Sequence, residues 1–330
     1  MNTLAKIDKP PIAVIITNFN GGKLIELCLA ALARQTHQNF QTIVIDNAST
    51  DGSAESILAN FPDVKLVQAA TNLGFAAGNN LGFKHAGSAE WIALLNPDAY
   101  AAPDWLEKFI FGAKSSVGFD FWGCTMRLAD TPEFLDGTAD IYHVSGLSWR
   151  RDHGASVKLG RNKGEEIFAP CAAAALFRRH LLDEVGGFDE RYFCYHEDVD
   201  LAFRLRLRGY RCGYVPEAVV DHVSSGITGR KSDFATYHGH RNLVWTYFKN
   251  MPTPMLWMYL PLHLLLNLIT VLYCGFRGQF SVILHAKWDA IRGLPSVLKQ
   301  RSKIQSGAKI KWQQIRPLMA RGIFSLWYRN

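Results

Sequence analysis

Residues 12–20 read IAVIITNFN, a run of apolar, mostly β-branched residues that ends in Thr17 and Asn18. A strand that is apolar at nearly every position is typical of a sheet buried on both faces. Residues 23–34 follow it with apolar side chains at helical spacing and predict a helix. A strand followed by a returning helix is the unit from which parallel sheets are built.

The same alternation continues to about residue 128. We expect further strands at 42–45, 64–67 and 91–95, and helices at 53–60, 75–85 and 104–114. The chain therefore predicts an α/β fold, a Rossmann-like and mostly parallel sheet flanked by helices. Residues 129–165 have no clear period, and we interpret them as an irregular segment with short strands. Residues 166–220 return to the alternating character.

The composition is that of an ordinary globular protein. The chain has 330 residues, of which 48% are hydrophobic and 20% are charged. These values exclude intrinsic disorder, a collagen and a disulfide-stapled miniprotein. The six cysteines form no CxxC pair, which argues against a zinc ribbon and indicates reduced thiols in a cytosolic protein. We expect no secretory signal, because the N-terminal residues have no long apolar run before a cleavage site.

The net charge of +7 is concentrated in the C-terminal region. Residues 277–330 contain eleven Lys or Arg and one acidic residue, whereas the preceding part has 25 basic and 28 acidic residues. Residues 255–276 (MLWMYLPLHLLLNLITVLYCGF) carry no formal charge and are long enough to cross a membrane, but Pro261, His263 and Asn267 interrupt them. We expect a helix in the membrane interface, with a full span and a buried core helix as alternatives. The basic tail favours contact with anionic lipids.

Polar side chains follow each of the four predicted strands. They are Thr17 and Asn18, Asp46 and Asn47, Thr71 and Asn72, and Asn96, Pro97 and Asp98. In an open α/β sheet the ligand crevice lies at the carboxyl ends of the strands, so these residues predict a polar ligand site. Turns also favour Asn and Asp after a strand. This alternative explains one such strand end better than it explains all four together.

The sequence lacks both common nucleotide fingerprints, since it has neither GxGxxG after the first strand nor GxxxxGK[ST]. The glycine-rich stretch NLGFAAGNNLG (72–82) precedes a predicted helix, and its backbone amides could face an anion. Asp98 is a candidate ligand for Mg²⁺ or Mn²⁺ held together with substrate phosphates. A simple turn is the alternative for Asp98.

Residues 195–200 read YHEDVD and place three carboxylates within four positions. Acids open this segment and an arginine-rich stretch closes it, which is the charge order of a helix rather than of a strand. We expect Asp200 to pair with Arg204 one turn later. Glu197 and Asp198 then remain for general base catalysis on a hydroxyl group, with helix capping as the alternative.

Together these motifs resemble glycosyltransferase family 2, the inverting, metal-dependent transferases with a GT-A fold, and most of all its rhamnosyltransferase-like branch. The matching pieces are ITNFNGG (16–22), VIDNASTDGS (44–53), NLGFAAGNNLG (72–82), LLNPDA (94–99), GGFDERYFCYHEDVDLAFRLRLRGYR (186–211), VPEAVVDH (215–222) and HRNLVWTYFKN (240–250). The resemblance implies a GT-A catalytic domain over 1–250, with a nucleotide-binding half at about 10–128 and an acceptor half at 129–250. Residues 251–330 would form a membrane-associating C-terminal region.

The resemblance also implies residue roles on the donor side. The nucleotide-binding positions are Thr17, Asn18, Asp46, Asn47, Asn72, Gly74 and Asn96, and Asp46 would contact the nucleobase. Asp98 matches the last Asp of the family's DxD metal motif, and Asn96 stands where the first Asp would be. His222 follows a strand-like run and matches a histidine that completes the metal site in related enzymes, as a neutral imidazole suits Mn²⁺.

On the acceptor side, Asp198 matches the catalytic base of the family and Glu197 its acidic neighbour. We expect sugar or acceptor contacts in the stretch 136–161, where Trp149 could stack on a sugar or belong to the core, and Asp200 is a further candidate contact. Asp198 would deprotonate an acceptor hydroxyl, which attacks the anomeric carbon of a nucleotide-sugar with inversion. A Mn²⁺ or Mg²⁺ ion on Asp98 would neutralise the departing diphosphate.

The resemblance favours dTDP-rhamnose as the donor, with UDP-hexoses next. It implies a lipid-linked saccharide acceptor at the cytoplasmic membrane face, in cell-surface polysaccharide synthesis. The protein would then be cytoplasmic, and peripheral or monotopic at the membrane.

Other function classes fit the sequence less well. A sugar-nucleotide nucleotidyltransferase should carry a glycine-rich, basic phosphate loop after the first strand, and ITNFNGGK (16–23) is a poor version of one. A non-catalytic membrane-bound saccharide- or nucleotide-binding module would not need both Asp98 and the acidic pair at 197–198. We expect no nucleic-acid partner, because the body around the acidic site is not basic.

Overall fold

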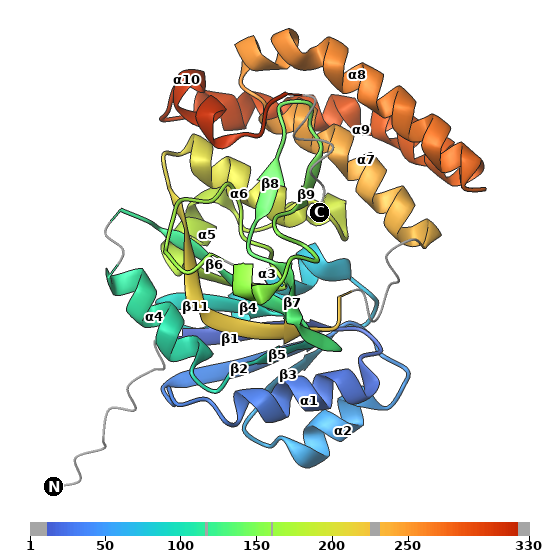
Figure 1. Cartoon of the computed structure of the whole chain (residues 1–330). Coiled ribbons are helices and arrows are strands. Elements are labelled where there is room, and N and C mark those ends of the chain that lie inside the picture. The colour runs from blue at the N-terminus through green and yellow to red at the C-terminus, as the bar shows by residue number, and fades with distance from the viewer. Residues whose placement is uncertain (1–11, 116–117, 160, 225–231, 323–330) are drawn as a thin grey trace, which may run out of the picture.

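The computed structural model describes residues 12–115, 118–159, 161–224 and 232–322. Its centre is a nine-stranded sheet with strand order β3-β2-β1-β4-β10-β6-β11-β5 and β7 paired to β6 (Figure 1). The strands of this sheet are β1 (Ile12–Asn18), β2 (Phe40–Asp46), β3 (Lys65–Gln68), β4 (Trp91–Leu95), β5 (Ala99–Ala101), β6 (Phe121–Leu128), β7 (Thr131–Gly137), β10 (Ala174–Arg178) and β11 (Cys212–His222). The short strands β8 (Asp140–Tyr142) and β9 (Ser148–Arg150) form a separate hairpin.

Helices cover both faces of the sheet and extend beyond it at the C-terminal end. They are α1 (Gly22–Leu32), α2 (Ser53–Asn60), α3 (Gly74–His85), α4 (Trp105–Ser115), α5 (Arg179–Val185), α6 (Glu197–Leu207), α7 (Asp233–Asn250), α8 (Thr253–Phe276), α9 (Phe280–Ser306) and α10 (Trp312–Ile315). The strands and helices predicted between residues 12 and 115 are all confirmed, and so is the helix that follows the acidic motif.

The first half of the sheet is parallel, because β1 pairs in parallel with both β2 and β4. β10 then enters antiparallel between β4 and β6, so the second half is mixed. Six of the nine strands (β1, β2, β3, β4, β6 and β11) still run in one direction, and their carboxyl ends meet at one edge. The predicted mostly parallel α/β sheet is therefore confirmed.

A buried ion cluster joins α6 to α7. Asp200 is fully buried and accepts hydrogen bonds from Arg204 Nε at 2.8 Å, Lys249 Nζ at 2.9 Å and Asn250 Nδ2 at 2.7 Å. Although burial opposes it, the two cations lower the pKa of Asp200. The predicted pairing with Arg204 is confirmed. The expectation that Asp200 contacts an acceptor sugar is wrong, because its carboxylate is saturated by protein donors inside the fold.

The C-terminal helices pack on the body of the protein. α9 runs along α7, and α8 lies against α9, away from α1 and α2 (Figure 1). Met255, Leu256, Ile315 and Met319 belong to the same buried cluster as apolar residues of the sheet. The helix predicted at 255–276 is confirmed within α8, which is long and apolar enough to cross a membrane by length and composition. Only 17% of its most apolar window is buried, so among the described residues α8 is not a buried core helix.

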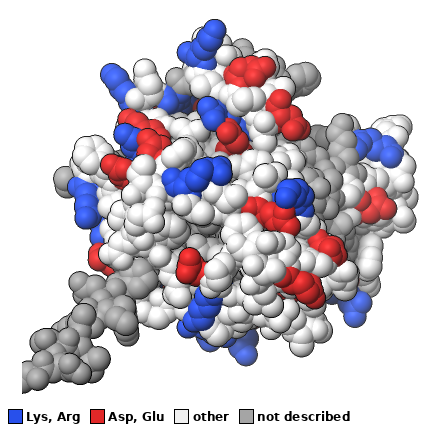
Figure 2. Space-filling model, turned by 90° about the horizontal axis from the view of Figure 1, so that it is seen from below, with Lys and Arg blue, Asp and Glu red and all other residues white. Residues whose placement is uncertain are grey.

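The face opposite these helices has an ordinary charged surface. Figure 2 shows Lys, Arg, Asp and Glu side chains intermingled on it, with no large area of one sign among the described residues in view. A nucleic-acid-binding surface needs clustered basic side chains. Among the described residues in view, this face has no such cluster.

Replacing Lys249 with Met should destabilise the protein by about 3–5 kcal/mol, because it removes one partner of a buried charge and leaves Asp200 incompletely compensated. The free energy of unfolding measured by urea denaturation tests this. Lys303→Met on the exposed side of α9 is the control and should change stability by less than about 0.5 kcal/mol. Equal stability of the two variants would contradict a structural role of the cluster.

Candidate active site

A cavity of about 790 Å³ opens at the carboxyl ends of β1, β2 and β4 and is closed on its other side by α6 and the β8–β9 hairpin. It brings together most of the residues that the sequence singled out. Those on its wall are Thr17, Asn47, Asn72, Gly74, Asn96, Asp98, Trp149, Glu197, Asp198 and His222. Three predicted residues, Asn18, Asp46 and Asp200, are not on this wall.

The donor side of the cavity has side-chain oxygens without hydrogen-bond partners. Thr17 Oγ1 and Asn47 Oδ1 are buried and unpartnered, whereas Asn47 Nδ2 donates to the Gly74 carbonyl at 3.1 Å. Buried polar atoms in folded proteins are nearly always hydrogen-bonded, so unpartnered ones on a cavity wall indicate a ligand. Asn18 and Asp46 lie beneath this wall, where Asn18 Nδ2 donates to Asp46 Oδ1 at 3.0 Å. The structure gives these two residues a supporting position instead of direct exposure to the cavity.

The N-terminus of α3 is closed by the protein itself. The amides of Phe75 and Ala76 both donate to the carbonyl of Phe193, at 2.7 and 3.2 Å, and the Gly74 amide donates to Asn72 Oδ1 at 2.9 Å. The prediction that the amides of the glycine-rich stretch face an anion is therefore wrong for these three. Phe193 reaches this position because its backbone adopts a left-handed φ of 64°. Gly74 is required opposite it, since a Cβ would lie 2.6 Å from the Phe193 oxygen.

Asp98 and His222 form the candidate metal site. Both are buried, and Nε2 of His222 lies 3.2 Å from Oδ1 of Asp98 without making a well-formed hydrogen bond. Asp136 accepts a hydrogen bond from Nδ1 of His222 at 2.9 Å, which fixes the ring and leaves Nε2 facing Asp98. A histidine held by a carboxylate on its far nitrogen is the usual arrangement of a metal ligand. The unpartnered Oδ1 of Asn96 is on the same wall, so the donor atoms fit a divalent cation.

The acidic motif opens α6 at the opposite side of the cavity. Asp198 Oδ1 accepts a hydrogen bond from the amide of Val199 at 2.8 Å, and Oδ2 accepts a longer one from the amide of Ala172 at 3.3 Å. Glu197 is buried with an unpartnered Oε2, and burial and the neighbouring Asp198 raise its pKa well above the usual range. The two acids therefore have different surroundings: Glu197 is buried without a partner for one oxygen, whereas both oxygens of Asp198 accept a backbone amide.

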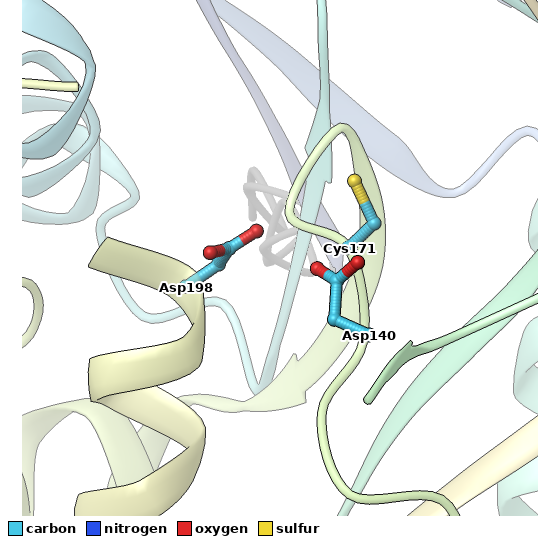
Figure 3. Close-up of side chains that lie close together, drawn as sticks. All are labelled: Asp140, Cys171 and Asp198. Carbon is cyan, nitrogen blue, oxygen red and sulfur yellow. The ribbon is translucent and has the colours of Figure 1, made fainter. Parts of the chain in front are cut away.

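The sequence did not single out Asp136, Asp140, Arg150 or Cys171. Figure 3 shows Asp198 on α6 pointing toward Asp140 and Cys171, which come from other segments. Donor atoms of these three residues lie within 4.8 Å of one another, a grouping that could hold a metal ion. The Arg150 guanidinium lies among them, with Nε 3.1 Å from Asp140 Oδ1 and an Nη atom 2.7 Å from Asp136 Oδ2.

The sequence contains a pattern that could have indicated the contact between Asp140 and Arg150. Asp140 and Arg150 are register partners across the β8–β9 hairpin, which turns near Gly146. Opposite charges ten residues apart around a glycine are consistent with such a pair. Both residues lie in the stretch 136–161, where sugar or acceptor contacts were expected. That expectation named Trp149, which is on the cavity wall, but not the carboxylate nearby.

Comparison with known proteins places this geometry in a family. Residues 13–186 match the model of "Glycosyl transferase family 2". The N-acetylglucosaminyl-diphospho-decaprenol L-rhamnosyltransferase of Mycobacterium tuberculosis is 30% identical over 251 residues, covering 68% of this chain and 80% of that protein. An O-antigen biosynthesis protein of Myxococcus xanthus is 26% identical over 239 residues, covering 68% of this chain and 18% of that protein.

Solved structures support the same fold. A mannosyltransferase from Pyrobaculum calidifontis in complex with GDP-Man and Mn²⁺ matches with a TM-score of 0.54 and 18% identity, covering 91% of this chain and 86% of that one. The structure of GalNAc-T7 with UDP, GalNAc and Mn²⁺ matches with a TM-score of 0.59 and 13% identity, covering 74% and 48%. At these identities the likeness shows the fold, which confirms the expected GT-A-like architecture. With its family-model match and its mycobacterial relative, the chain belongs to glycosyl transferase family 2.

Proposed function

We propose that the protein transfers a sugar, with inversion, from a nucleotide-sugar to a hydroxyl group of a saccharide acceptor. One observation carries this proposal: unpartnered polar atoms at the sheet edge face a pair of acids across one cavity. The unpartnered atoms are Thr17 Oγ1, Asn47 Oδ1 and Asn96 Oδ1, and the close pair of Asp98 and His222 lies on the same wall. The acids are Glu197 and Asp198. A donor site and a base on one cavity are what a direct displacement requires.

The relatives support a specific donor and acceptor. The mycobacterial relative is by name a rhamnosyltransferase that acts on a lipid-linked N-acetylglucosamine. We therefore propose dTDP-rhamnose as the donor and a lipid-linked saccharide as the acceptor, in cell-surface polysaccharide synthesis. A UDP-hexose is the second candidate donor, because the fold is shared with enzymes solved with UDP.

Asp98 and His222 would hold the divalent cation, Mn²⁺ or Mg²⁺, with Asp136 fixing the imidazole. When bound, such an ion supplies positive charge to the departing diphosphate. Asn96 replaces the first carboxylate of the usual motif, and its side-chain oxygen remains available on the cavity wall. The protein thus presents one carboxylate, one imidazole and one amide oxygen at the candidate metal site.

The acceptor hydroxyl would lie between the donor side and the start of α6. Asp198 accepts its proton, and the hydroxyl oxygen forms the new bond to the anomeric carbon on the face opposite the diphosphate, which inverts the configuration. The amides of Val199 and Ala172 hold the Asp198 carboxylate in place. Trp149 on the β8–β9 hairpin lines the cavity and also packs against a buried cluster, and we propose that it contacts the sugar.

The C-terminal helices would bring this cavity to a lipid-linked acceptor. α8 and α9 carry many exposed apolar side chains, which together are called the apolar face here. Its members are Trp257, Met258, Leu264, Leu265, Leu268, Ile269, Leu272, Tyr273, Phe276, Phe280, Leu284, Trp288, Ile291 and Leu298. Exposed apolar residues gathered on neighbouring helices mark interaction sites. Four exposed basic residues lie on or between the same two helices: Arg277, Arg292, Lys299 and Lys303. We propose that this face lies in the anionic interface at the cytoplasmic side of the membrane as a peripheral or monotopic anchor.

The donor site is tested by titrating dTDP, UDP and GDP with and without Mn²⁺. One nucleotide should bind in a metal-dependent manner, and Asp98→Ala should weaken that binding at least about tenfold, since one of few ligands is lost. Asp104→Ala, at a partly exposed acid just before α4, is the control and should bind as the wild type does. Absence of nucleotide binding under every metal condition would refute the donor site and favour a saccharide-binding module.

The base is tested by Asp198→Asn. We expect kcat to fall by about 10²–10⁴-fold, the usual contribution of general base catalysis, with nucleotide affinity unchanged. Asp183→Asn, an exposed acid on α5, should retain wild-type kcat. Retention of activity in Asp198→Asn would assign the base to another residue.

Membrane contact is tested by sedimentation with phosphatidylglycerol and phosphatidylcholine vesicles. The wild type should bind the anionic vesicles more tightly, and Leu265→Glu with Ile269→Glu should weaken binding at least about tenfold, because charges then enter the apolar face. Leu58→Glu, at an equally exposed leucine on α2, should leave binding unchanged. Equal sedimentation of all variants would contradict the anchoring face.

A further inference from the structure

Asp140 is a buried carboxylate on the cavity wall that the proposed reaction does not yet use. It lies at the start of β8, with 8% of its surface exposed, and its backbone amide is fixed by the carbonyl of Ala169 at 2.8 Å. Its carboxylate and that of Asp198 point toward one another across the acceptor side of the cavity (Figure 3). Two carboxylates this close cannot both ionise freely in a buried site.

The surroundings of Asp140 contain one cation and several acids. Arg150 on β9 contacts it at 3.1 Å, and Asp198 and Glu197 of α6 and Cys171 before β10 are its other titratable neighbours. Burial raises the pKa of the Cys171 thiol well above its usual range, so without a metal ion this sulfur is protonated and carries no charge. Arg150 already supplies the positive charge that a metal ion would bring. The group therefore fits a proton-sharing pair better than a second metal site.

We propose that Asp140 is the partner of the catalytic base Asp198. The proton removed from the acceptor hydroxyl is shared between these two carboxylates. This inference rests on the proposed transferase function and adds a residue to it. Asp140 acts through Asp198 and is in this sense a positioning residue. Arg150 keeps it in place, because the guanidinium is anchored on Asp136 at 2.7 Å from the other side.

The step balances with the groups at hand. The acceptor O–H bond breaks and its proton passes to an Asp198 oxygen, from which it is shared with Asp140. The acceptor oxygen uses the freed electron pair to bond the anomeric carbon. The bond from that carbon to the diphosphate oxygen breaks, and its electron pair leaves with the nucleotide diphosphate.

The protonation equilibrium of the pair supports this arrangement. Burial and the charge of Asp198 raise the pKa of Asp140 to about 7, against the opposing effect of Arg150. Above this pH the Asp140 carboxylate is ionised and can share a proton that arrives on its neighbour. Below it the pair already holds a proton. The rate should therefore rise as the pH increases through about 7.

The experiment is the pH profile of kcat/KM for the full chain, using the nucleotide-sugar whose nucleotide binds in the titration. The wild type should show a rising limb with a midpoint near pH 7. Asp140→Asn should shift this limb toward the range of an isolated carboxylate, roughly pH 4–5, and lower the plateau about tenfold. Asp140→Glu keeps a carboxylate and should retain a limb above about pH 6. Asp152→Asn, an acid of the same segment that contacts Arg161 instead, should keep the wild-type profile.

Each outcome distinguishes the inference from the function on which it rests. If the rising limb of the wild-type pH profile lies near pH 4–5, the inference is wrong whatever the variants show. It is also wrong if Asp140→Asn binds nucleotide normally and keeps the wild-type pH profile. Mn²⁺ binding without nucleotide can be monitored by electron paramagnetic resonance. If Asp140→Asn loses this binding, the group is a metal site and the proposed proton-sharing pair is wrong. Absence of sugar transfer by the wild type at every pH would instead refute the proposed function.

Discussion

The cavity depends on one guanidinium group, that of Arg150, which compensates the negative charge of two buried acids, Asp136 and Asp140. Asp98, Asp140 and Glu197 are buried on the cavity wall, and Asp136 is buried in contact with Arg150 and His222. Such charges repel unless cations or protons lie between them. Arg150 contacts Asp136 and Asp140 together, and Asp136 in turn holds His222 against Asp98. A continuous chain of contacts thus runs from the proposed metal site to Asp140, which faces Asp198. Arg150 of the hairpin is the link between the two ends.

A second constraint fixes the two halves of the site to each other. The Phe193 carbonyl caps α3 from a loop that leads directly into the acidic motif, and Gly74 leaves room for it. Tyr195 and His196 in that loop also adopt left-handed backbone conformations, which cost energy in residues with side chains. Backbone strain of this kind persists only where the surroundings hold it. Here it places Glu197 and Asp198 at a fixed distance from the donor side.

The C-terminal helices are part of the same architecture. α7 is tied to α6 by the ion cluster of Asp200, Arg204 and Lys249, and α9 packs along α7. The apolar face of α8 and α9 is therefore held in a defined orientation relative to the start of α6. A long-chain acceptor bound at a membrane would meet a cavity whose position is set by packing and not by a free linker.

The sequence alone determined the elements that repeat a local pattern. The apolar runs at 12–16 and 91–95, the helices between them, and the helical start of the motif at 197–198 follow from side-chain periodicity and charge order, which depend on near neighbours. Parallel strands necessarily align their carboxyl ends, so the presence of Thr17, Asn47 and Asp98 on one wall could be predicted. Tertiary structure alone decided that Asn18, Asp46 and Asp200 turn inward and that Asp140 faces Asp198. These positions are set by contacts between residues far apart in the chain, whose energies leave no periodic trace in the sequence.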